Sequence, residues 1–186
     1  MNPFNGKAML TFNAFKRLIH KQLILLTLFI FRHLKNYPIR YLTAQEKLLA
    51  QMVFGDLLDC EQPKIIATRY LPWQSCGIFM APNGNIYVNP SDYSENYALE
   101  SKFMQGIFIH ELTHVMQYQK GIHVLLKGAL LQSAYYLSLK SYNPYKYIYH
   151  PDKAFSSYNI EQQGEIARDI CTGKIPNIIC SPQLHL

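Results

Sequence analysis

The sequence predicts an α+β fold that is mostly helical, with a small antiparallel sheet or hairpin packed before a long central helix. Three observations indicate this class. Apolar residues recur with the helical period of 3.6 residues over several long segments. An Asn-Gly pair separates two short β-type runs, as in a tight hairpin turn. Finally, 49% of the 186 residues are hydrophobic and 16% are charged, a composition that argues against disorder across the whole chain.

A chain of this length most simply forms one domain with an appended arm. We assign residues 1–40 to an N-terminal apolar helical arm and residues 41–186 to the single domain. Residues 12–34 of the arm carry apolar side chains at helical spacing, and residues 23–31 form its apolar centre. That centre is about half of the roughly 20 residues that a membrane-spanning helix needs.

No small-x-small cleavage site of a signal peptide follows this apolar centre. We therefore favour a helix in residues 12–34 that is buried or packs on a partner. Contact with a membrane through the same residues is the alternative.

The net charge is +6, and much of the excess lies in the arm. The basic residues there are Lys7, Lys16, Arg17, Lys21, Arg32, Lys35 and Arg40. This asymmetry fits either an anionic partner such as a membrane surface or the solvated flanks of an apolar helix. No aromatic-basic signature accompanies it, so nucleic acid is not expected as a partner.

The four cysteines are Cys60, Cys76, Cys171 and Cys180, and no two of them form a C-x-x-C pair. This spacing excludes a zinc ribbon and a thioredoxin-type motif. Cys171 and Cys180 are either a disulfide in an oxidising compartment or two buried thiols, and the sequence leaves both open.

Cap and turn residues divide the first part of the domain into elements. Thr43, with Glu46 three residues later, forms the capping-box pattern at the start of a helix that reaches about Leu57. Residues 64–68 then predict a strand, and residues 77–88 predict a β-hairpin around the Asn-Gly turn.

Three more helices are expected after the hairpin. They cover about residues 96–120, 123–139 and 159–171, and glycines follow the first and the last of them, at Gly121 and Gly173. A loop rich in Tyr and Pro, with little periodicity, connects the last two helices.

The first of these helices contains His110-Glu111-Leu112-Thr113-His114, the H-E-x-x-H motif. Side chains at i and i+4 lie on one face of a helix, so His110 and His114 can bind one Zn²⁺ ion. Glu111 lies beside them, close enough to take a proton from a zinc-bound water as the general base. Apolar residues flank the motif, so its three ionisable side chains are exceptions in a core-facing run and need partners.

A catalytic zinc normally has three protein ligands and one open position. A metzincin site would need a histidine six residues after His114, but that position is Lys120. The gluzincin arrangement takes a Glu from a later helix instead, and Glu161 is the candidate third ligand. Glu165, one turn further on, is a candidate either to orient a ligand imidazole or to pair with Arg168.

Two further roles have candidates in the sequence. We favour Tyr149 and Tyr158 over His123 and His150 as donors to the oxyanion, because a phenol can donate without carrying a charge. Residues 85–89 form a strand before the H-E-x-x-H helix, which either binds an extended substrate by strand addition or is an ordinary sheet strand.

With these motifs in place, the chain resembles a bacterial zincin group known as Vgr-related proteins. The group includes metallopeptidase toxin domains that are fused to, or delivered with, the VgrG spike of type VI secretion systems. The matching segments are residues 42–46, 53–56, 80–87, 108–115 and 158–166. The resemblance covers about residues 41–170, and Met116 stands where the group usually has a Trp.

The resemblance implies a zincin-like metallopeptidase fold with His110, His114 and Glu161 on zinc. It also implies an antibacterial effector that hydrolyses peptide or protein substrates, cell-wall peptides among them, in the periplasm of a target bacterium. A cognate immunity protein would be a further partner, as would a secretion spike contacted through residues 12–34. The chain contains no VgrG spike or PAAR-like sequence, so delivery by that route has no support from the chain itself.

Two alternatives stay open. One is a catalytically inactive, zinc-stabilised binding module, although Glu111 is intact and a structural site does not need it. The other is a membrane-associated housekeeping peptidase of the producing cell's own envelope, anchored through residues 12–34.

Overall fold

The structure is a computed structural model that describes His20, Leu23 and residues 37–180. The chain divides into two compact units, residues 1–37 and 38–186, and all the named strands and helices belong to the second. The predicted helix of residues 12–34 lies outside the described residues, apart from His20 and Leu23.

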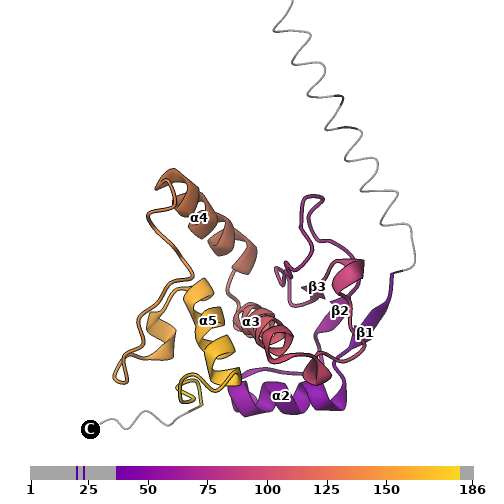
Figure 1. The fold of residues 1–186 in the computed structure, drawn as a ribbon, viewed down its shortest axis with the longest axis horizontal. Helices are drawn as coiled ribbons and strands as arrows, with labels where there is room; N and C mark the ends of the chain where they lie inside the picture. The colour runs from indigo at the N-terminus through magenta and orange to yellow at the C-terminus, as the bar shows by residue number, and fades with distance from the viewer. Residues whose placement is uncertain (1–19, 21–22, 24–36, 181–186) are drawn as a thin grey trace, which may run out of the picture. The chain divides into compact units, whose positions relative to one another are not determined.

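Helix α3 (Lys102–Gln119) is the central element of the second unit. Figure 1 shows it between α5 (Ile160–Cys171) and the β-sheet, with α2 (Ala44–Phe54) below and α4 (Val124–Leu137) leading away from it. The described residues thus contain four α-helices and one small three-stranded sheet. The predicted α+β class is confirmed.

The sheet is mixed rather than antiparallel, so this part of the prediction was wrong. Strand β1 (Ile39–Tyr41) pairs antiparallel with β2 (Lys64–Ile66), but β3 (Ile86–Tyr87) pairs parallel with β2. The long connection between β2 and β3 crosses back before β3 begins, which allows the two strands to run in the same direction. The strand expected at residues 64–68 is present as the shorter β2.

The predicted hairpin of residues 77–88 is reduced to one antiparallel bridge between Met80 and Tyr87. The side chain of Gln74 donates to the carbonyl of Ile78, a backbone acceptor that a longer strand pair would use, and also to the carbonyl of Tyr87. The turn itself is as expected, because Gly84 has a φ of +84°, a conformation that other residues rarely adopt.

Helix α2 begins at the predicted capping box. The hydroxyl of Thr43 accepts from the backbone of Glu46, and the Glu46 carboxylate accepts from the backbone of Thr43. The same fully buried carboxylate pairs with Arg40 of β1 and accepts from the backbone N–H of Tyr97. Three segments are therefore joined at one side chain. The helix ends at Phe54, and a short 3-10 turn replaces the expected last helical turn.

Helix α3 starts six residues later than expected. The Asn96 side chain caps only a 3-10 turn at Tyr97–Leu99, after which Glu100 is extended. The hydroxyl of Ser101 then caps α3 itself. Tyr97 remains in the core, where its ring stacks on Phe108 with centroids 5.2 Å apart.

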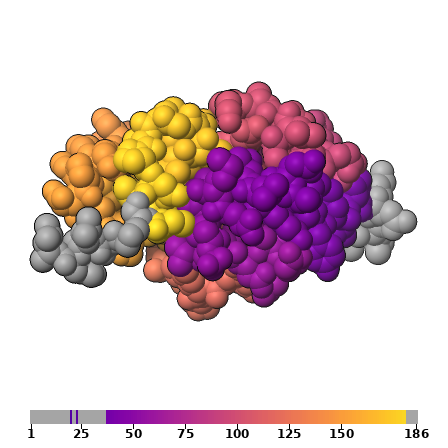
Figure 2. All heavy atoms as spheres, turned by 90° about the horizontal axis from the view of Figure 1, so that it is seen from below, coloured from indigo at the N-terminus to yellow at the C-terminus, as the bar shows by residue number. Residues whose placement is uncertain are grey.

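Helices α4 and α5 lie close to their predicted positions, and Gly121 and Gly173 have positive φ just after α3 and α5. Figure 2 shows α5, in yellow, beside the indigo residues that begin the second unit, on the face seen from below. No helix in residues 37–180 has the length and apolar character needed to cross a bilayer. All four cysteines are free thiols, so Cys171 and Cys180 do not form a disulfide.

Candidate metal centre

Helix α3 places His110 and His114 one turn apart on the face that meets α5. Both residues are buried, 8% and 6% exposed, and the centroids of their rings lie 5.0 Å apart at an interplanar angle of 75°. The apolar residues of α3 on either side of them belong to the hydrophobic core, so the two rings border that core. Polar groups in such a position need partners.

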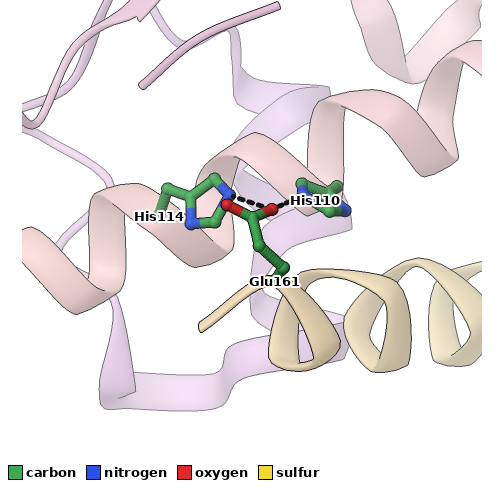
Figure 3. Close-up of side chains that lie close together, drawn as sticks. All are labelled: His110, His114 and Glu161. Carbon is green, nitrogen blue, oxygen red and sulfur yellow. Dashed lines mark ion pairs between the residues drawn. The ribbon is translucent and has the colours of Figure 1, made fainter. Parts of the chain in front are cut away.

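Glu161 supplies the third donor from the first turn of α5. Asn159 caps this helix and accepts from the backbone of Glu161, which fixes where the carboxylate emerges. Figure 3 shows the Glu161 carboxylate between the two imidazoles. Its Oε2 lies 3.4 Å from Nε2 of His110 and 3.4 Å from Nε2 of His114.

The three side chains fit a metal ion. Their donor atoms all lie within 4.8 Å of one another, and we call His110, His114 and Glu161 the metal centre. In a tetrahedral site with bonds of about 2.1 Å, two donor atoms are about 3.4 Å apart. The separations from the carboxylate to both imidazoles therefore match a zinc site, and two His with one Glu is the ligand set of a catalytic zinc.

Electrostatics also favour a cation at this point. Burial alone lowers the pKa of His110, but contacts with Glu161 and Glu165 outweigh it and raise that pKa to about 10. The pKa of His114 is also raised, because the contact with Glu161 outweighs burial, which alone would lower it. Burial alone raises the pKa of Glu161, yet the two imidazoles hold it well below its ordinary value. Because a proton and a metal compete for the same nitrogen, this negative environment also attracts a divalent cation.

Glu111 lies beside the metal centre without being part of it. Its carboxylate is buried, and Oε2 has no hydrogen-bond partner within the described part of the chain. Burial raises the pKa of this carboxyl, while His114, His110 and the backbone N–H of Ala81 partly offset the effect. A buried carboxylate oxygen without a hydrogen bond lowers the stability of the fold, so its presence calls for a functional explanation. A carboxylate with a raised pKa is suited to accepting a proton.

His110 is held from behind by α5. Its Nδ1 lies 3.1 Å from Oε1 of Glu165, and Arg168 lies 3.6 Å from the other oxygen of Glu165. Glu165 thus makes both of the contacts that the sequence offered as alternatives. Gly164 lets the ring approach the helix backbone, because a Cβ there would be 2.6 Å from Cε1 of His110.

His114 is held by a residue that the sequence reasoning missed. Its Nδ1 lies 2.8 Å from Oε1 of Gln117, which is buried on the same face of α3. The spacing of three residues on a helix was a usable signal for this contact. Gln117 also donates to Gln163 of α5, a contact that no sequence spacing indicates.

Neither predicted oxyanion donor has a described contact with the metal centre. The hydroxyl of Tyr158 donates to the carbonyl of Ile148 at 3.1 Å, so it is bound to the backbone rather than directed at the metal centre. None of the described hydrogen bonds, ion pairs or ring contacts joins Tyr149, His123 or His150 to the metal centre.

Tyr145 is the tyrosine that the structure brings to the site. Its ring centroid lies 6.4 Å from that of His110. Burial, and after it the charges of Glu161, Glu111 and Glu165, raise the pKa of its phenol. This residue stays protonated at neutral pH and can donate a hydrogen bond there.

Strand β3 does not offer the free edge that the sequence suggested. It pairs with β2 on one side, and the backbone N–H of Tyr87 donates to Met80 on the other. Because Met80 directs its own N–H and C=O toward Tyr87, Phe79 and Ala81 direct theirs to the opposite side. Phe79 and Ala81 are themselves buried, and the backbone N–H of Ala81 bonds to Glu111, so this segment is not an exposed edge either.

No protein-family model matches the chain, but comparisons with single known proteins show its family. Over 131 residues, 70% of this chain, it is 44% identical to the type VI secretion system spike protein VgrG2b of Pseudomonas aeruginosa. The aligned region spans only 13% of the length of that protein.

A solved structure gives the same relationship at the level of a domain. The effector domain of Pseudomonas aeruginosa VgrG2b superposes with a TM-score of 0.65 at 43% identity. The match covers 71% of this chain and 73% of the effector-domain chain. At this identity and coverage the similarity extends beyond fold to common ancestry. The chain therefore belongs to the family of the VgrG2b effector domain.

Proposed function

We propose that this chain is a zinc-dependent metallopeptidase with a zincin-like fold, in which His110, His114 and Glu161 hold the metal. One observation carries the proposal: two imidazoles and a carboxylate from two buried helix faces converge at zinc-site distances, with Glu111 beside them. A purely structural zinc site would not need Glu111, whose buried and unpaired oxygen costs stability.

The chemistry divides between the metal and the chain. Zinc, when bound, supplies a Lewis acid for the scissile carbonyl and lowers the pKa of water toward 7. Glu111 takes the proton from the attacking water and gives it to the leaving amine. Tyr145, rather than Tyr149 or Tyr158, donates a hydrogen bond to the developing oxyanion, because its ring lies beside that of His110.

We further propose that the domain is a delivered antibacterial effector that acts in the periplasm of a target bacterium. Its family supports this, because the relatives are a type VI secretion spike protein and an effector domain. The substrates are peptides or proteins, with peptide crosslinks of the cell wall as one class. A toxin of this kind would be paired with a cognate immunity protein in the producing cell.

Glu111→Gln tests the catalytic proposal. The amide keeps the shape of the side chain but cannot take a proton, so we expect hydrolysis to fall by about 10²- to 10⁴-fold with zinc content unchanged. Zinc is measured by mass spectrometry on the purified full chain. Activity is measured on casein and on cell-wall fragments, and toxicity by directing the chain to the periplasm.

Two further variants serve as controls. Glu61→Gln changes an exposed carboxylate far from the chemistry and should leave activity unchanged. His110→Ala should lose stoichiometric zinc. Full zinc in His110→Ala would overturn the proposed metal centre. Equal toxicity of the wild-type chain and Glu111→Gln, with zinc bound in both, would instead favour an inactive zinc-stabilised module.

A further inference from the structure

Three hydrogen bonds tie Gln117 to both halves of the metal centre. Its Oε1 lies 2.8 Å from Nδ1 of His114, while its Nε2 donates to the carbonyl of Ile160 at 3.1 Å and to Oε1 of Gln163 at 2.8 Å. The residue is 1% exposed. Both amide hydrogens and the amide oxygen are therefore used inside the protein.

Gln163 continues these contacts into the start of α5. Its Nε2 donates to the carbonyl of Tyr158 at 2.9 Å. Ile160 and Gln163 lie on either side of Glu161 in the first turn of this helix. The contacts of Gln117 thus run from one imidazole ligand to the turn that carries the carboxylate ligand.

The direction of these bonds determines which nitrogen of His114 can bind a metal. The amide nitrogen of Gln117 faces two acceptors, the Ile160 carbonyl and Gln163 Oε1, so the amide cannot turn round without losing both bonds. Its oxygen therefore faces His114 and can only accept, which places the hydrogen on Nδ1. The lone pair then lies on Nε2, the atom that faces Glu161.

We propose that Gln117 and Gln163, called the amide pair below, are positioning residues of the metal centre. The amide pair fixes His114 as an Nε2 ligand and fixes the separation of His114 from Glu161 across the two helices. This inference rests on the proposed zinc function and extends it to two residues outside the ligand set. Neither glutamine contacts the ligand-facing side of the metal centre, so both act through His114 and Glu161.

The two imidazoles are then supported in different ways. A carboxylate, Glu165, lies behind His110, whereas a neutral amide lies behind His114. A neutral acceptor orients the ring without adding a fourth carboxylate to a site that already contains Glu111, Glu161 and Glu165. This division explains why a glutamine, rather than a second glutamate, suits position 117.

The test compares zinc affinity with stability in the full chain. Gln117→Met removes all three hydrogen bonds and retains an unbranched side chain of similar length. We expect its zinc dissociation constant, measured by competition with a chromophoric chelator, to rise by about 10- to 100-fold. The visible absorption of the Co²⁺-substituted protein should change as well, because the coordination of His114 changes.

Gln163→Met is the second variant. It removes the acceptor for one hydrogen bond of Gln117 but leaves the contact between Gln117 and His114 in place. A smaller rise in the zinc dissociation constant is therefore expected. Gln119→Met is the matched control on the same helix: it removes two hydrogen bonds to Asp59 of the same kind, away from the metal centre. Its metal-free stability in urea should fall without a change in zinc affinity or in the cobalt spectrum.

The outcomes distinguish a failure of the proposed zinc function from a failure of the amide pair. Wild-type chain that does not bind zinc contradicts the proposed function itself. Wild-type chain that binds zinc, with Gln117→Met and Gln163→Met within twofold of it, overturns the amide pair alone. If Gln117→Met does not fold, unchanged affinity and an unchanged cobalt spectrum in Gln163→Met overturn the inference by themselves.

Discussion

At the scale of single residues, the contact between Gly164 and the ring of His110 leaves the least room for a change of residue. The absence of a side chain lets the ring lie against the backbone of α5, between Glu161 and Glu165. A glycine inside a helix normally costs up to about 1 kcal/mol relative to alanine. Its presence here is explained by the space that the imidazole occupies.

Gly164→Ala is therefore expected to weaken metal binding while favouring the helix. The new Cβ would lie 2.6–2.7 Å from three ring atoms, so the ring of His110 must move and loses its contacts to Glu161 and Glu165. We expect zinc affinity to fall by about 10- to 100-fold, as for other changes behind a ligand. Affinity is measured by chelator competition.

Gly128→Ala provides the comparison for this variant. Its Cβ would lie 3.6 Å from Oε1 of Glu161, an ordinary contact, so zinc affinity should change little. Wild-type affinity in Gly164→Ala would mean that the ring of His110 has room to move without leaving its position.

Helical periodicity sets how far the sequence could predict the site. His110, Glu111 and His114 share one helix, so their spacing alone places them together. The Gln117–Gln163 contact joins positions 46 residues apart, and no periodicity relates two helices in space. Tyr145 comes from a loop without periodicity, so its position depends on tertiary packing that the sequence does not display.

At the scale of elements, local signals were reliable and pairing signals were not. The capping box at Thr43 and the glycines after α3 and α5 are local chemistry, and the structure has them where they were expected. The direction of β3 depends on the path of the connection from β2, which no local pattern encodes. The predicted antiparallel sheet was wrong for this reason.

The junction of β1 and α2 gives an element-scale prediction. Glu46 is fully buried and pairs with Arg40 at 2.7 Å, and it also accepts from two backbone N–H groups. Arg40→Leu would leave a buried carboxylate without its counter-ion. We expect the free energy of unfolding in urea to fall by roughly 3 kcal/mol, as when one partner of a buried pair is removed.

Lys47→Leu on the same helix is the matched control. Its partner Glu61 is 75% exposed at the side chain, so the loss should be about 0–1 kcal/mol. Equal losses in the two variants would show that the Arg40–Glu46 pair contributes no more than a surface pair.

At the scale of the whole molecule, the metal centre connects helices that a long segment separates in sequence. Helix α3 ends at Gln119 and α5 begins at Ile160, with α4 and an irregular loop between them. The imidazoles come from one helix and the carboxylate from the other. A bound metal should therefore act as a cross-link that exists only in the folded chain.

Zinc is accordingly expected to raise the stability of the wild-type chain in proportion to its affinity. A ligand that binds only the folded state adds about 2.7 kcal/mol when its free concentration is 100 times its dissociation constant. Glu161→Ala removes the one donor from α5, so zinc should add much less to its stability. The measurement is the urea midpoint of each protein with and without zinc, which cancels any effect of the substitution on the metal-free chain. Glu61→Gln should gain as much as the wild type, and an equal gain in Glu161→Ala would show that zinc does not join α3 to α5.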